Sequence, residues 1–100
     1  MKDIYYIIQL IRIRPPLYIG ENSITTLYQF LNGCQFALKI SGVEEKPNFM
    51  DFHTWVRERL QLSPMSVNYA TTLLEYFHDE EIAMQKFFIL IDEYRAETNT

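Results

Sequence analysis

The chain has 100 residues, of which 48% are hydrophobic and 15% aromatic, and its formal net charge at pH 7 is −4. This length predicts one domain, and the composition is that of a packed globule, which excludes a disordered chain. The single cysteine, Cys34, excludes an internal disulfide and is typical of a reducing cytoplasm. No apolar run approaches the roughly 20 residues that span a bilayer, and no signal-peptide pattern is present, so we expect a cytoplasmic protein without membrane contact.

The charge is unevenly distributed along the chain. Residues 1–50 hold five basic and four acidic residues, whereas residues 51–100 hold four basic and nine acidic residues. Phosphate binding needs a basic surface, so this balance argues against direct nucleic-acid binding. It is compatible with a basic protein partner, although an acidic surface also serves solubility alone.

The first expected helix covers residues 3–13, where apolar residues recur at helical spacing, namely Ile4, Ile7, Ile8 and Ile11. Pro15 and Pro16 end this helix because proline disfavours helical geometry at the preceding residue and lacks a backbone N–H. Residues 14–20 are therefore expected to form a bent connector. Gly20 can adopt a positive φ at little cost, which allows the chain to turn into the next helix.

The second expected helix begins after a cap at Asn22 or Ser23 and ends near residues 41–42. Its apolar stripe consists of Ile24, Leu27, Tyr28, Leu31, Cys34 and Leu38. Gly33 lies within this helix, where glycine costs roughly 1 kcal/mol relative to alanine. We therefore expect Gly33 to permit close packing against another helix, the alternative being a break into two helices.

Three further helices are expected after a loop over residues 43–49. The third covers about 50–61, with Trp55 on its apolar side together with Phe52, Val56 and Leu60. The fourth covers about 64–77, with Ser63 and Pro64 as its start signal and Val67 among its apolar positions. The last follows a cap at Asp79 and runs to about 96, with its inward side formed by Ala83, Met84, Phe87, Phe88, Ile91 and Tyr94; residues 97–100 are expected to fray. The sum is an all-α, compact single-domain bundle of about five helices.

No residue pattern predicts catalysis or metal binding. Cys34 lies on an apolar stripe, and neither His53 nor His78 has a histidine or cysteine partner at helical spacing. We expect no catalytic residues, no metal and no cofactor. An alternative is a small metal-binding or enzymatic helical protein that uses the acidic cluster from His78 to Glu81, although acidic residues there are also typical of a helix start.

Three segments resemble the patterns of a family of small bacterial helical proteins. They are "RPPLYIG" at 14–20 with the following L-x-x-F-L-x-G at 27–33, "MDFHTWVRERL" at 50–60 and "HDEEIAMQKFFILIDEY" at 78–94. Together they cover most of the chain. The family includes immunity proteins of contact-dependent growth inhibition (CDI) systems. This chain departs from the family pattern at Leu17, where methionine is usual, and at Cys34, where tyrosine often follows the glycine.

The R-P-P-L-Y-I-G motif is interpreted as scaffold, together with Gly33 and Trp55. Arg14 is expected to bond carbonyls at a helix end or to pair with a carboxylate. Leu17 and Ile19 are expected to pack inward, and Tyr18 to bury its ring and bond a loop carbonyl through its hydroxyl. The motif thus indicates the fold more than a binding surface.

The resemblance implies an immunity protein that binds a cognate toxin domain, such as a basic nuclease of the RNase kind, and occludes its active site as a monomer in a 1:1 complex. A basic nuclease cleft attracts carboxylates, because these can substitute for phosphates electrostatically. The expected contacts are acidic residues with exposed aromatic anchors: Glu44, Glu45, Glu58, Tyr69, Glu75, Tyr76, Asp79, Glu80 and Glu81. A third alternative is a structural adaptor that recognises a peptide helix in a groove.

Overall fold

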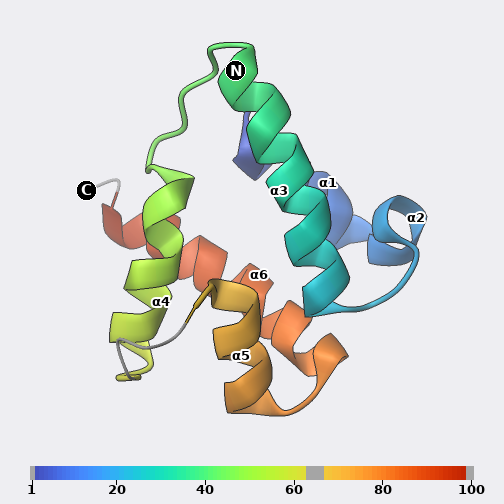
Figure 1. The fold of residues 1–100 in the computed structure, drawn as a ribbon, viewed down its shortest axis with the longest axis vertical. Helices are drawn as coiled ribbons and strands as arrows, with labels where there is room; N and C mark the ends of the chain where they lie inside the picture. The colour runs from blue at the N-terminus through green and yellow to red at the C-terminus, as the bar shows by residue number, and fades with distance from the viewer. Residues whose placement is uncertain (1, 63–66, 99–100) are drawn as a thin grey trace.

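The structure, a computed structural model, describes residues 2–62 and 67–98 and is all-α (Figure 1). Its elements are α1 (Ile4–Ile13), α2 (Pro15–Ile19), α3 (Ile24–Ile40), the 3-10 helix η1 (Phe49–Asp51), α4 (Phe52–Arg59), α5 (Tyr69–Phe77) and α6 (Glu80–Thr98). No strand occurs in these two ranges. The predicted bundle of about five helices is confirmed, with the five-residue α2 as an addition.

The two prolines start a helix. Pro15 and Pro16 occupy the first turn of α2, where a missing N–H costs no intrahelical hydrogen bond. Gly20 ends α2 with φ +84°, as predicted, and its N–H donates to the Pro16 carbonyl. The prediction that the prolines end the first helix is confirmed, because α1 ends at Ile13, whereas the short helix within the connector was not predicted. Leu17 is 65% exposed and Tyr18 is also exposed, so neither packs inward as predicted, because α2 presents only Ile19 to the core.

Helix α3 runs without a break through Gly33. Ser23 caps it by accepting a hydrogen bond from the Thr26 amide, as the sequence predicts. Gly33 lies on the exposed side of α3, and a Cβ built there meets no neighbouring atom within 4 Å. The prediction of close helix packing at Gly33 is therefore wrong, and so is the alternative of two helices.

The later helices differ from prediction mainly at their ends. Helix α5 begins at Tyr69 with Asn68 as its cap, later than the expected residue 64, because the Asn68 side chain accepts from the Thr71 amide and fixes the first turn there. Val67 precedes the helix and is 79% exposed. The expected start signal at residues 63 and 64 lies outside the described residues. Helix α6 continues through Thr98, so residues 97 and 98 are helical, and its predicted inward side chains are all buried.

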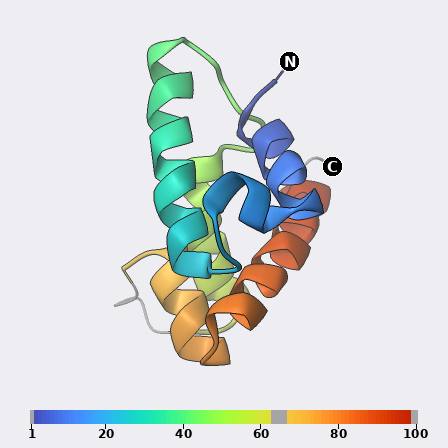
Figure 2. The same ribbon diagram turned by 90° about the vertical axis from the view of Figure 1, so that its right-hand side faces the viewer.

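The core lies where α6 contacts α3, α4 and α5 (Figure 2). Phe52 is fully buried, and the rings of Tyr69, Phe87 and Tyr94 meet it edge-on at centroid distances of 5.4 to 5.5 Å. The Cα radius of gyration is 13.0 Å, which matches a compact chain of this length. None of the helices within 2–62 and 67–98 has the length and apolar character needed to cross a bilayer.

Candidate partner-binding surface

The predicted acidic contact residues do not form one surface. Near its C-terminal end, Glu45 accepts a hydrogen bond from the Gln35 side chain at 2.9 Å. At its N-terminal end, Glu80 accepts from Thr25. A helix of 17 residues is about 25 Å long, so these carboxylates belong to separate surfaces. Glu58 lies on α4, on a third part of the molecule.

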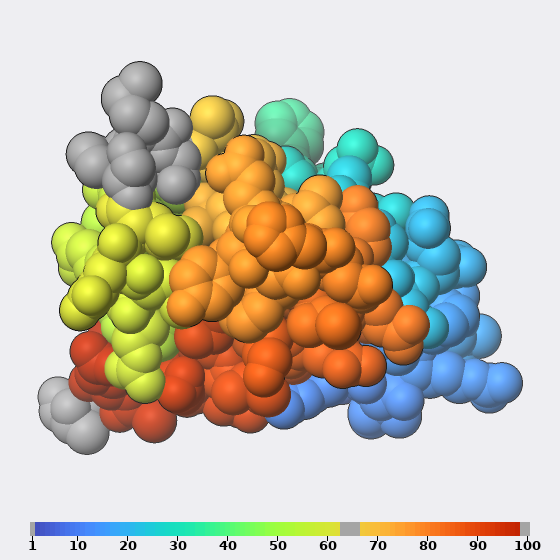
Figure 3. All heavy atoms as spheres, turned by 90° about the horizontal axis from the view of Figure 1, so that it is seen from below, coloured from blue at the N-terminus to red at the C-terminus, as the bar shows by residue number. Residues whose placement is uncertain are grey.

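Four of the nine predicted contact residues come together where α5 turns into α6. We call this surface the α5–α6 corner and define it by its exposed residues: Glu75, Tyr76, His78, Asp79, Glu81 and Ile82. Residues 60–85 of the sequence include four acidic residues and neither lysine nor arginine. Figure 3 shows α5 and the start of α6 at the centre of one broad face, beside α4. The next basic residue along the chain, Lys86, lies over the Phe77 ring at 5.8 Å from its centroid, and among the described residues it forms no ion pair with a corner carboxylate.

The turn at the corner is closed by hydrogen bonds at both helix ends. His78 adopts a left-handed conformation with φ +61°, and its amide donates to the Leu74 carbonyl at 2.8 Å. The Asp79 carboxylate accepts from the Ile82 amide at 2.8 Å and so caps α6, as the sequence predicts. This short turn fixes the angle between the two helices and therefore the spacing of the corner's side chains.

Glu80 forms hydrogen bonds to the start of α3 instead of facing solvent. Its carboxylate accepts hydrogen bonds from the Ser23 hydroxyl at 2.9 Å, the Thr25 amide at 3.0 Å and the Thr25 hydroxyl at 2.8 Å. Partial desolvation opposes ionisation, but the hydrogen bonds from Thr25 and Ser23 outweigh it and hold the pKa of Glu80 below its usual value. The structure thus gives Glu80 an internal bond where the sequence predicts a partner contact.

The two predicted aromatic anchors differ in exposure. Tyr69 is only 6% exposed and packs between Phe52 and Phe87, so the prediction that it is an exposed anchor is wrong. Its ring fills the core at the start of α5. Tyr76 is 48% exposed, and its ring meets that of Phe77 edge-on at 4.8 Å, so it is both accessible and supported.

Ile82 is an apolar corner residue that sequence reasoning missed. It is 44% exposed and lies on the outer side of α6, one turn after the Asp79 cap. Its exposure could have been predicted, because Ile82 lies outside the inward stripe that includes Ala83 and Phe87. Ile82 therefore adds an exposed apolar side chain to a corner that also exposes Tyr76 and carboxylates.

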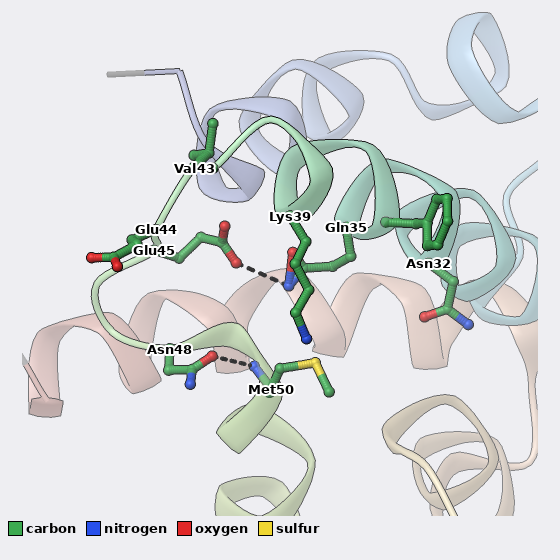
Figure 4. A pocket seen from close by; sticks show the side chains of 10 residues that line it. Asn32, Gln35, Lys39, Val43, Glu44, Glu45, Asn48 and Met50 are labelled. Atoms are coloured by element: carbon green, nitrogen blue, oxygen red, sulfur yellow. Dashed lines mark hydrogen bonds between the residues drawn. The ribbon is translucent and has the colours of Figure 1, made fainter.

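Glu44 and Glu45 border a different site, a groove of about 760 Å³ between the C-terminal half of α3 and residues 42–50 (Figure 4). The Glu45 carboxylate is occupied by Gln35, and burial together with the nearby charge of Asp3 raises its pKa. Figure 4 shows Lys39 extending across the groove toward Met50, while Glu44 points away from it. The groove therefore mixes both charges and is less suited than the corner to a basic partner.

The metal-binding alternative depends on the segment from His78 to Glu81. Asp79 accepts a hydrogen bond from the Ile82 amide and Glu80 accepts one from the Thr25 amide, so both carboxylates already have partners within the fold. Within the described ranges, no group of three or more His, Cys, Asp or Glu side chains is placed to hold a metal ion. Nothing in this geometry favours the alternative.

Comparison with known proteins adds no relative. No protein-family model, no curated protein and no solved structure matches the chain.

Proposed function

We propose that this chain is a cytoplasmic immunity protein, of the kind found in CDI systems, that binds a cognate bacterial toxin domain and occludes its active site. The observation that carries the proposal is the α5–α6 corner, where Tyr76, Ile82 and three carboxylates are all exposed on either side of one hydrogen-bonded turn. The resemblance of residues 14–20, 50–60 and 78–94 to immunity proteins supports the class.

The corner suits a basic, concave target such as a nuclease cleft. The carboxylates of Glu75, Asp79 and Glu81 would take the positions of substrate phosphates, and their charge would speed the encounter. Tyr76 and Ile82 would supply the apolar contact that gives most interfaces their binding energy. The chain needs no reaction of its own, because excluding the substrate is sufficient, and one copy would cover one toxin domain.

Growth protection tests this function. The C-terminal domain of the secreted protein encoded immediately upstream is expressed in a bacterium with or without this chain. We expect growth arrest without the chain and growth with it. Absence of any toxic domain in that position, or arrest despite folded chain, would contradict the function.

Charge reversal locates the surface in the same assay. Glu75→Lys with Glu81→Lys changes two exposed carboxylates that have no hydrogen bond within the described chain, so the fold should persist. We expect protection to be lost. Glu44→Lys is the matched control, because it reverses an exposed carboxylate beyond the other end of α3 and should leave protection intact. Protection lost only in the control would move the surface to the groove near Lys39.

A further inference from the structure

A second groove, of about 400 Å³, lies between α4 and the C-terminal part of α6. The residues that line it include the aromatic Trp55 and Tyr94 and the acidic Asp51 and Glu58. It is separate from the α5–α6 corner, because Ile82 and Tyr94 are 12 positions apart on α6 and a helix rises by about 18 Å over that distance. No lysine or arginine lines this groove.

The two carboxylates flank the indole ring on one side of the helix. Asp51 precedes Trp55 by four residues and Glu58 follows it by three, which are the spacings that place helix side chains next to one another. Neither carboxylate forms an ion pair with a residue of the described chain. The groove therefore combines an aromatic wall with two negative charges that have no internal counter-ion.

The aromatic walls are held in place by packing and by a hydrogen bond. Trp55 packs against Tyr94 at a centroid distance of 5.4 Å and against Phe52 at 6.1 Å. The Tyr94 hydroxyl donates to the Asn48 carbonyl. Burial, with the added charge of Asp51, raises the pKa of Tyr94, which agrees with a negative potential at this wall. A cation entering the groove meets a surface that is already ordered.

The chain itself shows that this indole accepts a guanidinium. Arg59 lies over the Trp55 ring at 5.5 Å from its centroid, and its guanidinium pairs with Glu93 at 2.9 Å. Arg59 is not part of the groove wall. Inside the groove, a second guanidinium would meet the part of Trp55 that lines it together with the acidic residues Asp51 and Glu58. Arginine suits it better than lysine, because a planar guanidinium stacks on a ring while donating to two carboxylates.

We propose that this groove binds an arginine side chain of the basic partner, with its guanidinium between Asp51 and Glu58 and against Trp55. Seven helical residues rise by about 10 Å, a span that two carboxylate side chains and one guanidinium can bridge. The inference rests on the proposed function, which makes the partner a basic protein. It adds a second, specific contact to the charge of the α5–α6 corner.

The only tryptophan of the chain reports on this groove. Three blocked tripeptides, with arginine, lysine or citrulline between two glycines, are titrated into the purified protein at constant ionic strength while Trp55 fluorescence is recorded. Citrulline keeps the shape of arginine and removes its charge. We expect saturable binding of the arginine peptide in the millimolar range, with the lysine peptide weaker and the citrulline peptide roughly tenfold weaker.

Two carboxylate variants complete the test. Asp51→Asn with Glu58→Gln should weaken arginine-peptide binding by roughly tenfold, whereas Glu75→Gln with Glu81→Gln, the same charge change at the corner, should leave it unchanged. Urea unfolding confirms that both variants fold. Equal binding of arginine and citrulline, unchanged binding in the Asp51/Glu58 variant, or no saturable signal would overturn the inference. None of these results depends on a toxin, so protection can hold while the groove inference fails, and the reverse.

Discussion

Glu80 and Thr25, 55 residues apart in sequence, join the start of α6 to the start of α3 through two hydrogen bonds. The Glu80 carboxylate accepts from the Thr25 amide at 3.0 Å and from its hydroxyl at 2.8 Å. The amide is one of the donors that a helix N-terminus leaves without an intrahelical partner, so a residue of α6 serves as a cap for α3. The position of the α5–α6 corner on the bundle depends on this link.

Removing the charge of Glu80 should destabilise the fold. We expect Glu80→Gln to lower the free energy of unfolding by about 1 kcal/mol, because bonds to a charged acceptor become weaker neutral ones. Glu81→Gln is the matched control, since it removes the same charge from the same first turn at an exposed position, and it should change stability by less than about 0.5 kcal/mol. Urea denaturation near neutral pH measures both. Equal effects would show that Glu80 acts only through the general charge of the helix start.

The contribution of Glu80 to the free energy of unfolding should also depend on pH. Its pKa is lower in the folded protein than the reference value of 4.5, so the folded state favours the charged form. The resulting stability is present above that reference value and is lost as the pH falls through the folded-state pKa. The difference in unfolding free energy between wild type and Glu80→Gln should therefore shrink in urea titrations below pH 4.5. A difference that grows on acidification would contradict this assignment.

Two buried tyrosines should respond oppositely to loss of the hydroxyl. The Tyr69 hydroxyl is buried without a hydrogen-bond partner among the described residues, whereas the Tyr5 hydroxyl donates to the Pro47 carbonyl. We expect Tyr69→Phe to raise the free energy of unfolding by up to about 1 kcal/mol and Tyr5→Phe to lower it by about 1 kcal/mol. Thermal unfolding distinguishes them. Destabilisation by Tyr69→Phe as large as that by Tyr5→Phe would mean that its hydroxyl is bonded.

Two glycines should likewise respond oppositely to alanine. Gly20 has φ +84°, which an alanine adopts only with strain, so Gly20→Ala should cost about 1 kcal/mol. Gly33 lies inside α3 with open space at its Cβ position, so Gly33→Ala should stabilise by about 0.5 to 1 kcal/mol. For a domain of this size, about 1 kcal/mol shifts Tm by about 4–8 °C, which calorimetry resolves. A lower Tm for Gly33→Ala would show that Gly33 is packed too closely to accept a Cβ.

Binding through the corner should be fast and sensitive to salt. We expect the association rate with the toxin domain to fall at least about tenfold between about 50 and 500 mM NaCl, while the dissociation rate changes less. In Glu75→Lys with Glu81→Lys, the rate at low salt should be reduced and its salt dependence lost. Stopped-flow mixing measures these rates. A salt-independent association rate in the wild type would show that charge does not steer the two proteins together.

Periodicity and capping signals predicted most helices and their buried sides. The stripe of α6, the Ser23 cap and the Asp79 cap are all confirmed. These features are local, since each depends on residues within one or two turns of a helix. The sequence alone was therefore sufficient for the all-α fold.

The errors concern features that depend on packing between distant elements. Tyr69 is buried because Phe52 and Phe87, from two other helices, surround its ring. Leu17 is exposed because the orientation of α2 turns Ile19 to the core. The sequence predicted the acidic residues of the corner as partner contacts. It did not show that Glu80 is bonded within the fold, because its partner Thr25 lies in another helix. Side-chain periodicity carries no information on such contacts.

Inhibition of the purified toxin domain by the purified chain is the direct test of active-site occlusion. The catalytic activity of that domain is measured as the chain is added in increasing amounts, with wild type and with Glu75→Lys/Glu81→Lys. We expect complete inhibition at one equivalent of wild type and little or none by the variant. The chain alone should consume no substrate. A toxin domain that stays fully active in the presence of excess folded wild-type chain would contradict it.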